Sequence, residues 1–307
     1  MSTDLERPTR RPDWLKIRLR TDGAFVELRS MVRELRLNTV CTEARCPNIY
    51  ECWSAGTATF MILGDTCTRR CGFCSVASGR PEPDVDAGEP ARVAEAVARL
   101  CLRHAVITSV DRDDLPDGGA GHFREVLRAI RERVPTCAVE VLTPDFKNKA
   151  GALEVVLDAG PVVFAHNVET VPRLYRAARP GSRYRGSIAL LAAAAAWRDA
   201  RAPRLRVKSS LMLGLGERRA EVVDVLGDLR RAGVDILTLG QYLQPTRDHL
   251  PVDRFVSPAE FDDLRVEAFG MGFLHCEAGP LVRSSYHAER HVPPESAHAL
   301  LGIGDAG

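Results

Sequence analysis

The stretch Cys67-Thr-Arg-Arg-Cys71-Gly-Phe-Cys74 places three thiols within one short loop, directly after the apolar segment 58–63. Three cysteines this close cannot easily pair among themselves as disulfides, and one of them would be left over. Thiolates select zinc or iron–sulfur clusters. A closed zinc site needs four ligands, whereas a [4Fe–4S] cluster on three thiolates keeps one iron free for another ligand. The spacing therefore predicts an open iron–sulfur cluster, with a zinc site as the alternative.

A second group of three cysteines lies upstream, at Cys41, Cys46 and Cys52. Pro47 interrupts this group, which indicates a loop and not one face of a helix. Two groups of three thiols so close in sequence indicate two metal centres, and the alternative is buried structural cysteine. The three other cysteines, expected to be small buried residues, are Cys101, Cys137 and Cys276.

Composition and length limit the class of protein. With 307 residues, 45% apolar and 27% charged, the chain suits one large globular domain with additions. A net charge of +1 gives no electrostatic argument for a nucleic-acid partner. Residues 1–20 lack the apolar core of a signal peptide, and the longest apolar run, 188–197, is too short to cross a bilayer. We therefore expect a protein of the cytoplasm, with an organelle matrix as the alternative, that has no membrane partner and whose clustered cysteines serve metal chemistry.

The first part of the chain changes character near residue 23. Residues 1–23 are basic and interrupted by proline, which is typical of a solvated terminus. The alternative is a docking strip for an acidic partner. Apolar residues then recur at helical spacing across 24–37, which predicts an amphipathic helix that leads to the upstream cysteine group.

From residue 57 onward, short apolar runs alternate with amphipathic segments. Runs typical of buried strands lie at 57–63, 104–110, 137–143, 161–166, 204–212 and 235–241. Helical patterns lie at 90–102, 120–133, 149–158, 170–177 with 185–198, 218–232 and 257–270. Six β–α units predict a parallel sheet with helices outside, and six are too few for a closed eight-stranded barrel. The expected fold class is α/β, a partial (β/α)6 TIM-like barrel, with its function at the carboxyl ends of the strands.

Polar side chains follow each expected strand, at the edge where a barrel of this kind binds its ligand. The alternative for any one of them is a capped turn into the next helix. A lysine within a strand is costly to bury unless its charge meets a carboxylate, so we expect Lys208 to face a ligand. His166 is expected to be a hydrogen-bonded pocket residue and not a metal ligand. The other candidates at these strand ends are Thr108, Ser109, Asp111, Asn167, Glu169 and Gln241.

The spacing of Cys67, Cys71 and Cys74, with Phe73 before the last of them, resembles the signature of the radical S-adenosylmethionine superfamily. The resemblance implies that the free iron binds the amino and carboxylate groups of S-adenosylmethionine. It also implies that one electron cleaves the sulfonium and gives a 5′-deoxyadenosyl radical. Phe73 and the strand-end candidates are then the expected contacts of S-adenosylmethionine.

Both cysteine groups, together with the closing Arg283-Ser-Ser-Tyr286, resemble the lipoyl synthases over residues 12–290. The stretches that carry this resemblance further are 64–71, 107–119, 166–169 and 239–245. The resemblance implies two [4Fe–4S] clusters. Cys67, Cys71 and Cys74 would hold the one that binds S-adenosylmethionine. The implied ligands of the auxiliary cluster are Cys41, Cys46, Cys52 and Ser285, with Ser284 as the alternative to Ser285.

The resemblance also implies an activity. A lipoyl synthase is a sulfurtransferase that inserts sulfur at C6 and C8 of an octanoyl chain, and its auxiliary cluster is the sulfur source. The chain is carried on a lysine of a lipoyl domain, in the acyltransferase subunit of a 2-oxoacid dehydrogenase or in the glycine-cleavage carrier protein. Further implied partners are reduced flavodoxin or ferredoxin and an iron–sulfur cluster carrier. The implied parts are an extension at 1–56, a barrel at 57–272 and an extension at 273–307.

The chain departs from the expected family pattern at Ala55, Ala165, Ser210 and Arg218, and none of these positions is a ligand candidate. Two other functions fit some of the features. A methylthiotransferase would add a C-terminal nucleic-acid-binding module, and only a short tail follows Arg283 here. An iron–sulfur or zinc carrier would not cleave S-adenosylmethionine.

Overall fold

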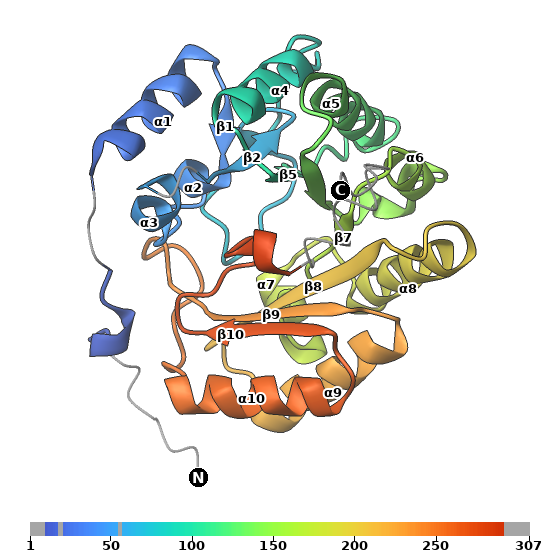
Figure 1. The fold of residues 1–307 in the computed structure, drawn as a ribbon. Coiled ribbons are helices and arrows are strands. Elements are labelled where there is room, and N and C mark those ends of the chain that lie inside the picture. Colours follow the sequence, from blue (N-terminus) through green and yellow to red (C-terminus); the bar gives the residue numbers. More distant parts are fainter. Residues whose placement is uncertain (1–9, 18–20, 55–56, 292–307) are drawn as a thin grey trace, which may run out of the picture.

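The computed structural model describes residues 10–17, 21–54 and 57–291. Its central element is a sheet with the strand order β1-β2-β5-β6-β7-β8-β9-β10, which is curved into a ring (Figure 1). Neighbouring strands pair in parallel, except that β1 is antiparallel to β2. The strands are β1 (Asn38–Thr39), β2 (Thr59–Ile62), β5 (His104–Ser109), β6 (Ala138–Leu142), β7 (Val163–Ala165), β8 (Arg206–Leu213), β9 (Ile236–Gln241) and β10 (His275–Gly279).

Helices surround the sheet on its outer side. Those of the β–α units are α4 (Glu89–Arg99), α5 (Ala120–Arg133), α6 (Ala152–Asp158), α7 (Tyr175–Ala178), α8 (Tyr184–Arg201), α9 (Arg219–Arg231) and α10 (Pro258–Gly270). The N-terminal helices are α1 (Gly23–Glu34), α2 (Val40–Glu43) and α3 (Ile49–Ser54). The short 3-10 helices are η1 (Asp13–Leu15), η2 (Phe146–Asn148), η3 (Pro172–Leu174) and η4 (Ala288–Arg290). A small parallel pair, β3 (Thr66–Cys67) and β4 (Ala77–Ser78), frames the downstream cysteine loop.

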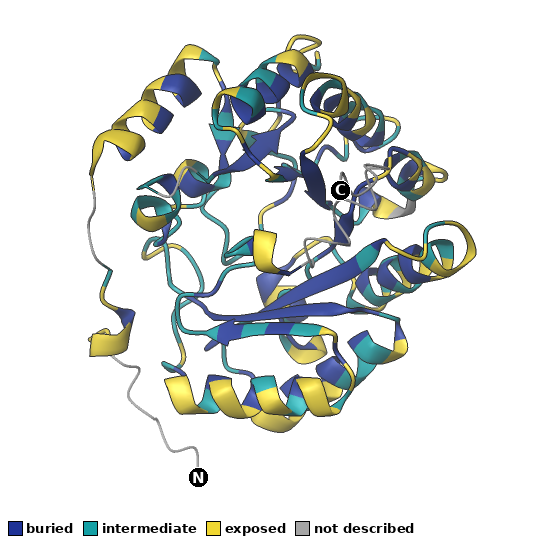
Figure 2. Cartoon of the chain, viewed as in Figure 1, coloured by how far each residue is buried: buried dark blue, intermediate teal, exposed yellow. Residues whose placement is uncertain are grey.

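The core lies between the sheet and these helices. Figure 2 shows most strands of the ring buried and the helices exposed on their outer faces, while β10 alternates between buried and half-buried residues. β2 and β9 are buried at every position, as expected for parallel strands that are covered on both sides. In α1, the Asp22 carboxylate caps the helix by accepting from the Phe25 N–H at 3.1 Å, and the buried face then packs against α3. None of the described helices is long and apolar enough to cross a membrane.

The expected partial barrel is confirmed, and each of the six expected strands is present. β10 is a seventh parallel strand, and it lies in the stretch that the sequence interpretation placed in the C-terminal extension. Its sequence, His-Cys-Glu-Ala-Gly, alternates polar and small residues, which hides it from a search for apolar runs. Among the described residues β10 and β2 do not pair, and the ring therefore stays open between them.

Side chains from both ends of the chain close this gap, which we call the seam. Asn48 Nδ2 donates to the Leu281 carbonyl at 2.8 Å. The Tyr286 hydroxyl donates to Glu51 Oε1 at 3.0 Å. Gly240 of β9 allows the close crossing of the C-terminal segment, because a Cβ there would overlap the Val282 carbonyl oxygen.

Three expectations about single residues have different outcomes. Cys137 and Cys276 are buried, but Cys101 is exposed, so that expectation is wrong for Cys101. Cys101 lies in the turn after α4 with φ of 51°, and this turn faces solvent. Ala55 and much of the basic arm, residues 1–9 and 18–20, lie outside the described residues.

Candidate active site

A cavity of about 470 Å³ opens at the carboxyl ends of the strands. Its wall combines the ends of β5, β6, β8 and β9 with the loops that follow them, at the edge the sequence analysis expects. Five of the six clustered cysteines line this cavity, and the sixth, Cys52, interacts electrostatically with Cys41 and Cys46. All six are free thiols. The two cysteine groups therefore face one shared space.

Backbone geometry fixes the downstream cysteine loop at the mouth of the barrel. The Cys67 Sγ accepts N–H hydrogen bonds from Arg69 at 3.4 Å and from Asp111 at 3.3 Å. Burial raises the pKa of the Cys67 thiol to about 11, with the nearby Asp111 carboxylate acting in the same direction. A Cβ at Gly72 would lie 2.8 Å from the Ala177 carbonyl oxygen, so the loop can approach α7 only with glycine there.

The upstream cysteines interact with one another, and two of them line the same cavity as a serine from the far end of the chain. Cys41 lies in α2, Cys52 lies in α3, and burial raises the pKa of these thiols to about 11 and about 12. The Ser285 hydroxyl accepts a hydrogen bond from Thr59 Oγ1 at 2.8 Å and lines the same cavity as Cys46. Three thiols and one hydroxyl form a four-ligand set, and buried thiols need a cation to become thiolates. These donors therefore fit an iron–sulfur cluster.

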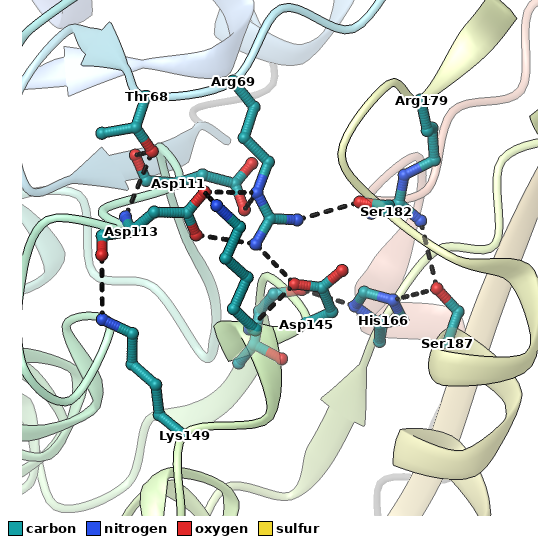
Figure 3. A network of polar contacts seen from close by, with 12 residues as sticks. Thr68, Arg69, Asp111, Asp113, Asp145, Lys149, His166, Arg179, Ser182 and Ser187 are labelled. Atoms are coloured by element: carbon teal, nitrogen blue, oxygen red, sulfur yellow. Dashed lines mark hydrogen bonds and ion pairs between the residues drawn. The ribbon is translucent and has the colours of Figure 1, made fainter. Parts of the chain in front are cut away.

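Arg69, inside the downstream loop, is the centre of a polar network (Figure 3). Its guanidinium donates to both oxygens of Asp113, at 2.9 and 2.8 Å, and to Asp145 at 2.6 Å. It also lies 3.3 Å from Asp111 and donates to Ser182 at 2.9 Å. Burial by itself would raise the pKa of Asp113 and of Asp145, but bonding to Arg69 holds both below the usual value. The network ties the loop to the ends of β5 and β6.

His166 lies beside this network with both ring nitrogens bonded. Nδ1 donates to the Thr143 carbonyl and Nε2 accepts from the Ser187 hydroxyl, both at 2.9 Å (Figure 3). Burial lowers the pKa of His166 to about 4, and the nearby Arg179 charge acts in the same direction. The ring is therefore neutral at neutral pH and has no free nitrogen for a metal, as expected from the sequence.

A second polar group on the cavity wall has groups free for a ligand. Arg179 donates to the Asn167 carbonyl at 2.6 Å, and Asn167 Oδ1 is buried without a hydrogen-bond partner. Glu169 is held at a positive φ of 69°, and burial raises the pKa of its carboxyl group. Both Arg179 and Glu169 interact electrostatically with Cys71. Sequence reasoning missed Arg179, because an arginine before a Pro-Gly turn carries no signal of a buried position.

The other predicted contacts divide into two sets. Phe73, Ser109 and Asp111 line the cavity, and the Ser109 hydroxyl has no hydrogen-bond partner in the described part of the chain. Thr108 and Gln241 also line it, but their polar atoms are engaged by backbone. Thr108 Oγ1 donates to the Leu142 carbonyl, and the Gln241 amide bonds to backbone of residues 242, 254 and 256.

Lys208 is not among the residues that line the cavity. Its ammonium group donates to Glu140 Oε1 at 2.6 Å, and both side chains are 1% exposed. The sequence argument was right that this charge must meet a carboxylate. The carboxylate belongs to the protein, on β6, and not to a ligand.

Comparison with known families gives two matches. The model of the radical SAM superfamily matches residues 61–238, and the model of the N-terminal domain of lipoyl synthase matches residues 3–46. Lipoyl synthase of Symbiobacterium thermophilum is 55% identical over 299 residues, covering 97% of this chain and 91% of that protein. Lipoyl synthase of Methylococcus capsulatus is 56% identical over 289 residues, covering 93% of this chain and 87% of that protein.

Solved structures share the fold at low sequence identity. Methylornithine synthase is 14% identical with a TM-score of 0.53, covering 84% of this chain and 79% of that one. SuiB of Streptococcus suis, solved with S-adenosylmethionine bound, is 14% identical with a TM-score of 0.51, covering 80% of this chain and 56% of that one. At this identity the likeness concerns the fold alone.

Proposed function

The chain belongs to the lipoyl synthase family of radical S-adenosylmethionine enzymes, and from this premise we propose how its residues divide the work. The protein is a sulfurtransferase with two [4Fe–4S] clusters and S-adenosylmethionine as cofactors. When bound, these groups supply the radical hydrogen abstractions at C6 and C8 of an octanoyl chain and the two sulfur atoms inserted there. An unactivated C–H bond is beyond any side-chain acid or base, so the cofactors must supply this chemistry.

We propose that Cys67, Cys71 and Cys74 hold the cluster that binds S-adenosylmethionine. The proposed ligands of the auxiliary cluster are Cys41, Cys46, Cys52 and Ser285. One observation carries this proposal: both cysteine groups and the Ser285 hydroxyl adjoin a single cavity. The protein can then hold one alkyl chain between two metal centres and keep solvent away from it.

The polar wall near Cys71 has the charges that the methionine moiety needs. We propose that the Arg179 guanidinium faces its carboxylate and the Glu169 carboxylate faces its ammonium group. Asn167, Ser109 and Phe73 would complete the contacts, whereas Thr108, Asp111 and Gln241 shape the wall. We propose no contact for Lys208, because its charge is already paired.

The substrate is a lipoyl carrier domain, which follows from the family. Within that class we propose the carriers of the 2-oxoacid dehydrogenases and of glycine cleavage. Reduced flavodoxin or ferredoxin is the proposed electron donor, an iron–sulfur cluster carrier rebuilds the auxiliary cluster, and the compartment is the cytoplasm. The proposed division is an extension at 1–56, a barrel at 57–279 that includes β10, and a tail from residue 280.

A single-turnover assay on an octanoyl-lysyl peptide tests these roles. Anaerobically reconstituted protein should contain about eight irons and eight sulfides per chain, as two cubane clusters require. With dithionite and S-adenosylmethionine it should form 5′-deoxyadenosine and a peptide with two added sulfurs. Cys74→Ala should form neither product, and Cys41→Ala should form 5′-deoxyadenosine without the two-sulfur peptide. A Cys41→Ala enzyme that still makes this peptide would overturn the assignment of the upstream group.

A further inference from the structure

A second cluster of ligand-type side chains lies inside the ring, apart from the cysteine cavity. It consists of His275 and Glu277 on β10 and His291 at the end of the described chain, and none of the three lines that cavity. Along β10, Cys276 and Ala278 are buried in the core, on the side where α10 packs. Because side chains alternate along a strand, His275 and Glu277 face the opposite side, the interior of the ring.

The C-terminal segment brings His291 to these two residues. η4 contacts β5 and lies at the centre of the ring, drawn in red in Figure 1. The rings of His275 and His291 are 4.6 Å apart between centroids. His275 Nε2 lies 3.7 Å from Glu277 Oε2, and one ligand atom from each of the three residues lies within 4.8 Å of the others.

The burial of His291 has no explanation among the described residues. The residue is 4% exposed, and neither ring nitrogen has a hydrogen-bond partner. His275 Nε2 also lacks a hydrogen bond. An unsatisfied buried polar group costs about 1–3 kcal/mol, and native structures contain few of them. Three unsatisfied imidazole nitrogens that converge at one place indicate that a further ligand satisfies them.

The charges around the cluster are mixed. The Lys208 ammonium group acts on both histidines of the cluster and by itself opposes a further cation. Its charge is paired with Glu140 at 2.6 Å, however, and His104 lies 3.5 Å from the same carboxylate. Glu277 pairs with no lysine or arginine in the described part of the chain. The cluster therefore offers two neutral imidazoles and one carboxylate whose negative charge is not offset. Two histidines and a carboxylate are a common donor set for Zn²⁺ and related divalent ions.

We propose that His275, Glu277 and His291 bind one divalent cation of the zinc type, separate from the iron–sulfur clusters. Zinc ligands lie about 2.0–2.2 Å from the metal, so the three side chains need only small rotations to close around it. The ion joins β10 to the C-terminal segment. Ser284 and Ser285 lie in the segment between these two anchors, and the ion therefore limits the movement of the proposed serine ligand.

Zinc binding to the iron-replete enzyme tests this directly. Reconstituted protein with its full iron content is titrated with ZnSO₄ and desalted, and its metals are counted. We expect one retained zinc per chain with no loss of iron, and X-ray absorption showing imidazole nitrogen and oxygen ligands. His291→Ala and Glu277→Gln should each weaken zinc binding about tenfold or more. His122→Gln is the matched control. His122 bonds to Glu89 on the outer side of the barrel, so this variant should leave zinc binding unchanged.

Several outcomes would overturn the site. The site is refuted if the wild-type enzyme retains no zinc after desalting. It is also refuted if X-ray absorption shows sulfur ligands around the retained zinc, or if the variants bind zinc as tightly as wild type. If His291→Ala does not fold, Glu277→Gln and the wild-type spectrum decide. Iron content and 5′-deoxyadenosine formation are measured on the same samples. Failure of the zinc site is therefore distinguished from failure of the proposed cluster ligands.

Discussion

The Ser285 hydroxyl is already engaged by Thr59, which fixes the orientation of its oxygen at the edge of the cavity. An alkoxide or hydroxyl is a harder and weaker partner for iron than a thiolate. Our hypothesis is that this lability helps the auxiliary cluster release an iron when its sulfur is consumed. Ser285→Cys should then keep about eight irons per chain but make less of the two-sulfur peptide, which iron analysis and mass spectrometry measure.

Ser284→Ala is the matched control for this variant, because Ser284 lines the same cavity one position away. It should retain both iron content and product. Full activity in Ser285→Cys would contradict the lability hypothesis. Loss of the auxiliary cluster in Ser284→Ala but not in Ser285→Ala would transfer the ligand role to Ser284.

His166 makes the stability of the fold sensitive to acid. Its pKa is about 4 in the folded chain because of burial, against an ordinary value of 6.5. The unfolded chain therefore binds a proton between these values while the folded chain does not, and stability is lost as the pH falls from 6.5 to 4. From this one group we expect a loss of about 2 kcal/mol in unfolding free energy between pH 7 and pH 5.

Anaerobic denaturant titrations of wild type and His166→Gln at these two pH values measure the contribution. The glutamine cannot take up a proton, so the variant should show a smaller change of unfolding free energy with pH, whatever its stability at pH 7. Equal pH dependence in the two proteins would refute this account. His122→Gln is the control for a histidine outside the barrel interior.

At the scale of the elements, Arg69 connects the downstream cysteine loop to two strands. It bonds Asp113 after β5 and Asp145 after β6, and its side chain is 3% exposed. Removing one partner of a buried ionic network leaves uncompensated charges and costs about 3–5 kcal/mol. Arg69→Met should therefore lower the unfolding free energy by that order and lower the iron retained by the loop.

Arg70→Met is the matched control, because Arg70 is the exposed neighbour in the same loop. Thermal unfolding and iron content of the two variants are compared after identical reconstitution. Wild-type stability and iron content in Arg69→Met would show that backbone contacts alone hold the loop.

The elements also show what the sequence could reveal. The strands with apolar runs and the helices with an apolar face were predictable, because burial on both sides or on one side leaves a periodic pattern. β10 was not predictable in this way, because its inward-facing residues are the polar His275 and Glu277, which interrupt any apolar run. Arg69 appeared only as part of a motif, since its partners lie 44 and 76 residues away. The pairing of Lys208 with Glu140 depends in the same way on which strands become neighbours.

The candidate site was partly predictable at the scale of the whole molecule. Thiol spacing indicated two metal centres, because a ligand set within one loop is a local property. Two features depend on how the ring is left open. The two cysteine groups face one cavity, and Thr59 bonds to Ser285, which lies 226 residues away in the sequence. No local pattern encodes that arrangement.

The N-terminal arm supports a prediction about docking of the carrier domain. Arg10 and Arg11 are exposed, and Arg11 lines the cavity, so their charges lie where a carrier must approach. An acidic carrier surface would be attracted there, and salt would weaken the attraction. Arg10→Glu with Arg11→Glu should raise the KM for an octanoylated carrier domain and reduce the salt dependence of kcat/KM, with kcat little changed.

We choose substitution of the two arginines over truncation of the arm because a truncation that extends past Leu15 would also remove this buried side chain, which is only 2% exposed. Arg201→Glu, an exposed change at the opposite end of the barrel, is the control and should leave the KM unchanged. An unchanged KM in the double variant would remove the arm from the docking surface.

The seam has a further consequence for repair of the enzyme. Opening the ring between two paired strands would break a continuous ladder of backbone hydrogen bonds. The seam is held instead by hydrogen bonds from side chains, each worth on the order of 1 kcal/mol. The proposed auxiliary-cluster ligands Cys52 and Ser285 lie next to residues that form this weak boundary, so we expect a donor protein to reach a spent cluster through local opening. We expect amides at 281–286 to exchange with deuterium well before those of β9, and equal protection of both would mean that rebuilding requires global unfolding.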